Sequence, residues 1–235
     1  MVIPAYNEAA PDRLPKSLQE VVAFVEKQNF SIEVVIVNNN STDDTLKIAE
    51  AAAANHEYIC VISEKTQGKG AAVKAGMMQA RGEYLFICDA DFSMPVEETL
   101  KFIPPQLSNY DIAIASREAP GAKRVGEPEY RHIMGRIFNM LVRILAVRGL
   151  QDTQCGFKCF RREVANVLFP LQTINGWAFD VELLFAAQRR GYKIVEVPIT
   201  WIYKDQSKVK PITDAYNMVM EILKIRQNAW RGLYK

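Results

Sequence analysis

Two aspartates separated by one residue follow an apolar run in the first half of the chain. Asp89 and Asp91 close the segment EYLFICDAD (83–91), whose apolar residues predict a buried strand. Carboxylates at this spacing can approach one hard divalent cation, Mg²⁺ or Mn²⁺, which would also bind phosphate oxygens of a substrate. The same residues could instead cap a helix, because Ser93 and Pro95 follow them. The position directly after a strand favours the metal site.

Polar residues also follow three other strand-like runs. They occur in PAYNE (4–8), in VNNNSTDDT (37–45) and at Ser116-Arg117. Polar side chains and backbone N–H groups at such turns can hold a base, a ribose and phosphates, although these residue types are also common in ordinary turns. The GKG turn (68–70) opens a helix-like segment and could meet phosphate too, but it lacks the Walker pattern.

The elements that would position these side chains alternate between strand and helix. This alternation predicts an α/β fold: a Rossmann-like, mostly parallel sheet with helices on both faces. Ligands bind such sheets at the carboxyl ends of the strands, so the four polar strand ends predict one shared site. The strand-like segments are 2–4, 32–37, 58–62, 83–91 and 111–116, and the helix-like segments are 13–28, 41–53 and 68–80.

The second half of the chain has a different pattern. Residues 118–130 contain Gly and Pro without periodicity and predict a mobile loop. Amphipathic helices are expected over 131–148 and 212–231, a further helix over 178–191, and one or two strands over 193–203. Because no internal repeat or low-complexity segment interrupts the chain, we predict a single domain over residues 1–235.

Charge is distributed unevenly along the chain. The net charge is +2, but residues 1–130 carry −7 and residues 131–235 carry +9. The basic half indicates either a differently solvated face or contact with an anionic surface. The aromatic and basic interleaving of a nucleic-acid-binding module is absent from the sequence, so no nucleic-acid partner is expected.

The sequence also bears on location. Met1 runs directly into VIPAYNE without a signal-peptide pattern, and no apolar stretch reaches the roughly 18 residues that span a bilayer. The four cysteines lack the two-residue spacing of redox or zinc motifs. We therefore expect a cytoplasmic protein that touches a membrane only peripherally.

Taken in order, the motifs resemble those of family-two glycosyltransferases of the A-type nucleotide-sugar-binding fold. The resemblance runs from residue 2 to about residue 209 and is closest to the branch that makes dolichyl-phosphate or polyprenyl-phosphate sugars. DTQCGFK (152–158), WAFDVELL (177–184) and SKV (207–209) look more like the β-glucosyl than the mannosyl subgroup. The remaining motifs are PAYNE, VNNNSTDDT, QGKGAAVKAG, ARGEYLFICDADFS and ASREAPG.

The resemblance implies an activity and a mechanism. A hexose, with glucose from UDP-glucose favoured, would pass with inversion and with metal dependence to a polyprenyl or dolichyl phosphate. That acceptor is already an anionic nucleophile, so no strong general base is required. Residues 1–117 would form the nucleotide-sugar-binding half, and residues 118–235 the acceptor and membrane-facing half. Residues 118–130 would order over bound substrate.

The resemblance also implies roles for individual residues. Asp89 and Asp91 would hold the metal, and together with Arg117 and Arg131 they would be the catalytic residues. The nucleotide would lie against Pro4, Ala5, Tyr6, Glu8, Asn39, Ser41, Lys69, Asp89 and Ala90. The sugar and the acceptor phosphate would lie against Ser116, Arg117, Arg131, Asp152, Gln154, Trp177 and Asp180.

Two departures from the family pattern leave alternatives open. Asn38, Asn39 and Asn40 stand where many members have Asp-Asp-Gly, and Ser93 stands where mannosyl enzymes often have Gln. The alternatives are a GDP-mannose-dependent mannosyltransferase, a glycosyltransferase with another acceptor, a nucleotidyltransferase, and a non-catalytic scaffold at a membrane surface. The oligomeric state is not predicted.

Overall fold

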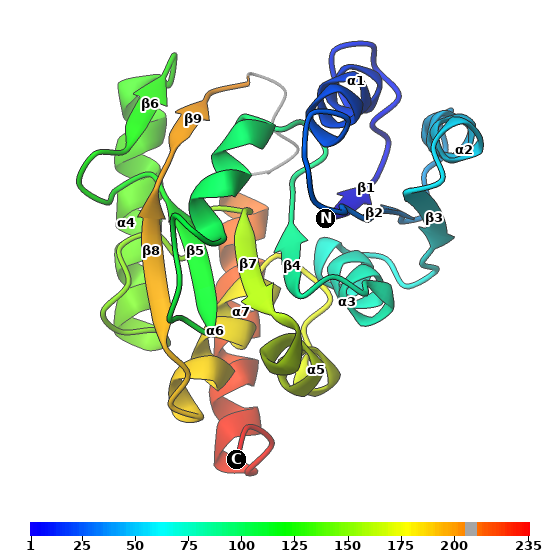
Figure 1. Cartoon of the computed structure of the whole chain (residues 1–235). Coiled ribbons are helices and arrows are strands. Elements are labelled where there is room, and N and C mark those ends of the chain that lie inside the picture. Colours follow the sequence, from blue (N-terminus) through cyan, green and yellow to red (C-terminus); the bar gives the residue numbers. More distant parts are fainter. Residues whose placement is uncertain (205–210) are drawn as a thin grey trace.

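The computed structural model describes residues 1–204 and 211–235, and a seven-stranded sheet forms its centre (Figure 1). The strand order is β3-β2-β1-β4-β7-β5-β8. β7 runs antiparallel to both of its neighbours, and the other paired strands are parallel. The strands are β1 (Val2–Ala5), β2 (Val34–Asn38), β3 (Ile59–Ser63), β4 (Tyr84–Ile87), β5 (Ile112–Ser116), β7 (Lys158–Arg161) and β8 (Ile194–Pro198).

Helices cover both faces of this sheet (Figure 1). Side chains alternate along β1 and β2, so that Val2 and Val35 join one apolar cluster while Ile3 and Ile36 join the other. The first cluster includes residues of α3 (Lys69–Gln79), α4 (Glu129–Leu145), α5 (Arg162–Leu171), α6 (Phe179–Arg189) and α7 (Pro211–Trp230). The second includes residues of α1 (Leu14–Val25), α2 (Thr45–Asn55) and the 3₁₀ helix η1 (Val96–Phe102). The predicted α/β fold is confirmed.

Four elements escaped the sequence analysis: η1, β6 (Lys123–Val125), β7 and α5. The prediction of a loop without secondary structure over 118–130 is wrong in part, because β6 lies within it. β6 pairs in parallel with β9 (Thr200–Ile202), which places Arg124 opposite Trp201. The expected region of one or two strands over 193–203 therefore consists of two, which belong to different sheets.

Two further predictions concern the second half. The central sheet contains strands from both predicted halves of the chain, because β7 lies between β4 and β5. The assignment of nucleotide binding to residues 1–117 and acceptor binding to residues 118–235 stays a prediction. The SKV motif (207–209) falls outside the described residues. Within the part of the chain that the structure describes, no helix is long and apolar enough to cross a bilayer.

Candidate active site

A cavity of about 250 Å³ lies at the edge of the sheet where β4 and β5 have their carboxyl ends. Its walls come from the start of α3, the turns after β4 and β5, one side of α4, the loop before β7 and the start of α6. Residues distant in sequence therefore meet where a parallel sheet is expected to bind ligands. The predicted site residues that line it are Lys69, Asp89, Arg117, Asp152, Gln154, Trp177 and Asp180.

Asp89 and Lys69 form an ion pair at the cavity wall. The Lys69 Nζ lies 2.5 Å from Asp89 Oδ1 and 5.5 Å from the centre of the Trp177 ring. Burial alone would lower the pKa of Lys69, but the charges of Asp89 and Asp180 raise it above its usual value. A β-carbon at Gly156 would lie 2.1 Å from Asp89 Oδ2, so Asp89 rests directly on the backbone there. The lysine is thus charged and points to the same carboxylate that was predicted to bind metal.

Asp91 lies beside Asp89 in a turn that directs the chain away from β4. Its Oδ1 accepts hydrogen bonds of 3.0 Å from the backbone N–H and from the hydroxyl of Ser93. Burial raises the pKa of Asp91, and the neighbouring charge of Asp89 raises it further. Two crowded carboxylates are the donor set that a hard divalent cation prefers, so these residues fit the predicted metal.

A second acid of the cavity is held by a lysine that the sequence analysis missed. Lys158 Nζ lies 3.0 Å from Asp180 Oδ1, and both side chains are buried. Burial raises the pKa of Asp180, although Lys158 and Lys69 act in the opposite direction. Lys158 also donates to the Cys155 carbonyl at 2.5 Å. Its signal in the sequence is a single charge at the start of an apolar strand, CGFKCF (155–160).

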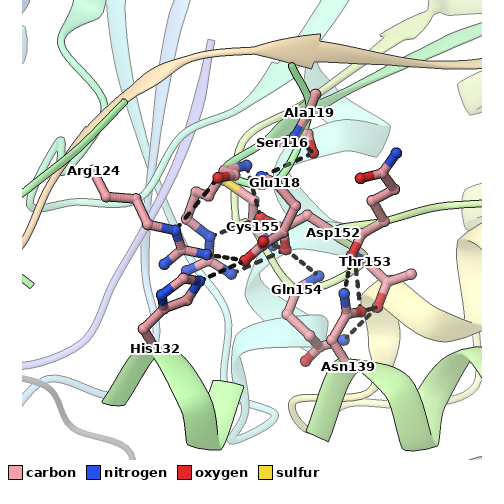
Figure 2. A network of polar contacts seen from close by, with 12 residues as sticks. Ser116, Glu118, Ala119, Arg124, His132, Asn139, Asp152, Thr153, Gln154 and Cys155 are labelled. Carbon is pink, nitrogen blue, oxygen red and sulfur yellow. Dashed lines mark hydrogen bonds and ion pairs between the residues drawn. The ribbon is translucent and has the colours of Figure 1, made fainter. Parts of the chain in front are cut away.

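Arg117 is oriented by Asp152 rather than left to rotate. Its Nε and Nη2 donate to the two oxygens of Asp152 at 2.7 and 3.0 Å, and its backbone N–H donates to Oδ2 at 3.0 Å. Burial would raise the pKa of Asp152, but Arg117 outweighs it and lowers the pKa to about 2. The Asp152 carboxylate also accepts a hydrogen bond of 3.2 Å from the backbone N–H of Cys155, in the same loop before β7 (Figure 2). Asp152 was predicted to contact the sugar, whereas its carboxylate is occupied by Arg117.

Asn39 is buried at the end of β2 and holds the turn before α3. Its amide nitrogen donates to the carbonyls of Glu64 and Thr66 at 3.0 and 2.7 Å. Its amide oxygen accepts from the backbone N–H of Gly68 at 2.9 Å. The side chain was predicted to face a base, but in the structure these groups are bonded within the protein. The residue that follows Gly68 is Lys69, so Asn39 supports the site indirectly.

The other residues predicted to bind the nucleotide lie at the neighbouring ends of β1, β2 and β4 and do not line the cavity. Pro4 and Ala5 belong to β1, Tyr6 is 41% exposed and Ala90 is buried. Glu8 pairs with Arg13, and its backbone N–H donates to Thr45 Oγ1 at 2.7 Å. The Ser41 hydroxyl accepts from the backbone N–H of Asn7 at 3.1 Å. Their roles in binding stay predictions.

Two residues predicted on the acceptor side lie apart from the cavity. Ser116 is fully buried, and its hydroxyl accepts from the backbone N–H of Ala119 at 3.1 Å, which closes the turn after β5 (Figure 2). The guanidinium of Arg131 lies 5.3 Å from the centre of the Tyr203 ring, and Arg131 is not among the residues that line the cavity.

Other cavity residues were not named individually as site residues in the sequence analysis. Asn139 and Arg136 come from α4, and Glu118, Arg124 and Glu127 come from 118–130, the segment predicted to be a mobile loop that orders over bound substrate. Asn139 ties α4 to the loop before β7, because its Oδ1 accepts from the hydroxyl of Thr153 at 2.8 Å (Figure 2). The signal available in the sequence was the concentration of charge between two strand-like regions.

Comparison with known proteins gives this geometry a context. The family model described as "Glycosyl transferase family 2" matches residues 1–169. A dolichyl-phosphate beta-glucosyltransferase of Trichomonas vaginalis is 37% identical, over 99% of this chain and 72% of the relative. The proteins of that name from Homo sapiens and Saccharomyces cerevisiae are each 34% identical, over 98% and 100% of this chain and 76% of the relative.

Solved structures support the fold. Glucosyl-3-phosphoglycerate synthase from Mycobacterium tuberculosis in complex with UDP superposes with a TM-score of 0.69 at 17% identity, over 95% of this chain and 78% of that one. Mannosyl-3-phosphoglycerate synthase from Rubrobacter xylanophilus gives a TM-score of 0.70 at 18% identity, over 98% and 74%. These similarities show that the chain shares the A-type glycosyltransferase architecture.

Proposed function

The chain belongs to glycosyl transferase family 2, and we propose that it transfers glucose from UDP-glucose to the phosphate of dolichyl phosphate or a related polyprenyl phosphate. The three curated relatives described above are dolichyl-phosphate beta-glucosyltransferases. The chain aligns with them over nearly its whole length, so the comparison covers the acceptor side as well as the nucleotide side.

The observation that carries the proposal is the composition of the cavity. One wall presents Asp89, Asp180 and Lys69, and another presents Arg117 and Arg136. A sugar diphosphate and a phosphate monoester are both anions, and each needs its own cationic partner within one small space. The cavity thus has the two kinds of wall that a glycosyl transfer between phosphates requires.

The chemistry follows from bringing the two substrates together. An oxygen of the acceptor phosphate attacks the anomeric carbon of glucose, while the bond from that carbon to the UDP oxygen breaks and UDP takes the electron pair. Direct displacement inverts the anomeric centre and gives a β-linked glucosyl phosphate. Arg117, fixed by Asp152, contacts the acceptor phosphate without reorganising, and fixed charges of this kind lower the barrier.

A divalent cation, Mg²⁺ or Mn²⁺, fits the carboxylates of Asp89 and Asp91. Bound there, it would supply positive charge against the diphosphate of the donor. Lys69 supplies a positively charged side chain at the same position, because its Nζ contacts Asp89. Burial, and then the charge of Asp89, raise the pKa of Asp91, and a bound cation would oppose both effects by stabilising the ionised carboxylates.

A peripheral position on the cytoplasmic face of a membrane is part of the proposal. One side of α4 presents five apolar side chains that are each 50–67% exposed: Ile133, Met134, Ile137, Met140 and Ile144. Arg136 and Arg143 lie on the same helix and are also exposed. An exposed apolar stripe flanked by arginines is suited to an interface of anionic lipids. A lipid acceptor could then reach the cavity, which α4 lines with its other side.

A donor panel tests the proposed activity. The purified chain is incubated with Mg²⁺ or Mn²⁺, a short polyprenyl phosphate, and UDP-glucose, GDP-mannose or UDP-N-acetylglucosamine, and the released nucleotide is measured. We expect UDP from UDP-glucose only when the lipid phosphate is present, and no release with Asp91→Ala. GDP release from GDP-mannose would show that the transferred sugar is mannose instead of glucose. Pyrophosphate release would indicate a nucleotidyltransferase. A folded protein that turns over no donor would contradict the proposal.

A further inference from the structure

Arg124 lines the cavity beside Arg117, and its charge is held by two glutamates. Its Nη2 lies 2.5 Å from Glu118 Oε1, and its Nη1 donates to Glu127 Oε2. Its Nε donates to the backbone carbonyl of Arg117 at 3.4 Å. Figure 2 shows Arg124 and His132 both directed toward Glu118, and His132 Nε2 lies 3.3 Å from the same carboxylate oxygen. The two glutamates also line the cavity.

The two arginines are placed by the same aromatic ring. The guanidinium carbons of Arg117 and Arg124 lie 5.3 and 6.0 Å from the centre of the Trp201 ring. The pairing of β6 with β9 sets Arg124 opposite Trp201, so its place is fixed by backbone hydrogen bonds. Arg131, the second arginine predicted from the sequence, stacks on Tyr203 and does not line the cavity. Arg124 therefore lines the cavity beside Arg117 on the β6 side, in addition to Arg136 of α4.

The partners of the two arginines differ in how firmly they are held. Asp152 is 2% exposed and accepts from the backbone N–H groups of Gln154 and Cys155 as well as from Arg117, so its carboxylate is a fixed part of the protein. Among the residues that the structure describes, the carboxylates of Glu118 and Glu127 are contacted only by side chains: Arg124 contacts both, and His132 contacts Glu118. They flank a short strand rather than a buried loop.

These side chains also have an excess of negative charge. Arg117 and Arg124 contribute two positive charges, and Asp152, Glu118 and Glu127 contribute three negative ones. An anion that entered this cluster with all three carboxylates in place would be repelled. A guanidinium binds a phosphate through the same forked geometry with which it binds a carboxylate, so a phosphate can take the place of a glutamate.

We propose that Arg124 is a second binding residue for the acceptor phosphate and that Glu118 and Glu127 occupy it until the phosphate displaces them. The inference rests on the proposed function for the identity of the acceptor and adds a specificity element to it. A phosphate monoester carries close to two negative charges near neutral pH and can replace both carboxylates. A phosphodiester, such as an ordinary phospholipid headgroup, carries one and competes less well. The exchange thus selects the acceptor from the surrounding lipids.

Equilibrium binding of farnesyl phosphate to the full chain, in the absence of any donor, tests this exchange. Arg124→Gln is expected to weaken binding by about tenfold or more, because a charged hydrogen-bond donor is lost. Glu118→Gln and Glu127→Gln are expected to tighten binding several-fold, because a competing charge is removed. Lys123→Gln, an exposed neighbour on the same strand, is the matched control and should leave the affinity unchanged. Thermal unfolding verifies that each variant is folded.

The arginine and glutamate substitutions are expected to change the affinity for farnesyl phosphate in opposite directions. This distinguishes a binding role of Arg124 from a purely structural one. If Arg124 only cross-linked the segment, its own substitution and the two glutamate substitutions would all weaken binding, and that result would overturn the proposal. Equal affinity of the wild type for farnesyl phosphate and its methyl ester would overturn the selection of monoesters. Because no donor is present, opposite signs found in a protein that fails to transfer glucose would uphold this inference and reject the proposed function.

Discussion

Arg117 is oriented by a carboxylate of the cavity wall that is almost completely buried. Asp152 is 2% exposed, and its pKa is lowered to about 2 because Arg117 outweighs the effect of burial. The ionised form is therefore favoured by folding. A carboxyl group with a lowered pKa in the folded state contributes stability above its unfolded pKa of about 4, and this contribution is lost as the pH falls toward 2.

Asp152→Asn should remove this contribution and leave Arg117 without its partner. Breaking one side of a buried ion pair costs about 3 kcal/mol of unfolding free energy at pH 7, as measured by urea denaturation. The difference between wild type and variant should narrow as the pH falls from 4 to 2. Asp44→Asn removes an exposed pair with Lys47 and is the control, with no measurable change expected. Equal stability of wild type and Asp152→Asn at pH 7 would reject this account.

Asn39→Asp tests whether the turn before α3 needs an amide. The substitution replaces the donor to the Glu64 and Thr66 carbonyls by an oxygen that repels them, at a cost of about 2 kcal/mol in unfolding free energy. Because the turn also positions Lys69, kcat/KM for UDP-glucose should fall as well. Asn55→Asp, on the exposed end of α2, controls for the change of charge. Wild-type stability of the Asn39→Asp variant would show that the turn holds without these donors.

At the scale of elements, the loop before β7 is shaped by one glycine. Gly156→Ala would place a β-carbon 2.1 Å from Asp89 Oδ2, so the Asp89 carboxylate must shift, and we expect its pair with Lys69 to weaken. We expect weaker Mn²⁺-dependent binding of UDP-glucose, measured by calorimetry, and a loss of about 1–3 kcal/mol in stability. Gly135→Ala, in α4 where an added β-carbon meets nothing within 4 Å, should not lower stability. Unchanged donor binding in Gly156→Ala would disprove the close approach.

Elements were predictable from sequence where a periodic or apolar run was long. α1, α3 and the buried strand β2 show such runs, and all three were predicted. β7 escaped because its four residues include Lys158, whose charge is balanced by Asp180, a residue more than 20 positions away. β6 escaped because its partner β9 lies about 75 residues further along the chain. Short elements stabilised by distant partners carry no local signal.

The site followed the same rule. Asp89, Arg117 and Trp177 could be predicted because motif order and strand ends point to them, and they line the cavity. Arg124 could not, because only the pairing of β6 with β9 brings it beside Arg117. The hydrogen-bond partners of Asn39 and Asp152 also could not be predicted from the sequence, because these partners depend on tertiary contacts.

At the scale of the whole molecule, α4 separates two environments. Its Asn139 and Arg136 line the cavity, whereas Ile137 and Met140 are more than half exposed. α7 packs against α4, and its Glu221 accepts from the backbone N–H of Ala178 at 3.0 Å, next to Trp177 of the cavity wall. α4 thus carries exposed apolar and basic side chains directly beside the cavity.

Ile137→Glu should weaken binding to anionic lipid vesicles by about tenfold in a sedimentation assay, because it places a charge in the apolar stripe. Met78→Glu, on α3, changes an apolar side chain that is also more than half exposed, and this variant should bind vesicles like the wild type. Raising the salt concentration should weaken the wild type as well, since arginines contribute. If the two variants bind alike, α4 is not the membrane contact.

The position of β7 between β4 and β5 has a consequence for folding during translation. β4 ends at Ile87, yet its partner on that side is completed only when Arg161 has been added. At about 5–20 residues per second, translation takes roughly 4 to 15 seconds to cover that distance. Throughout this interval, the edge of β4 that later pairs with β7 has unpaired backbone N–H and C=O groups. A strand of another chain could pair with this edge. A fragment that stops near residue 117 would keep this edge of β4 unpaired, because it lacks β7, and we expect such a fragment to aggregate more readily than the full chain.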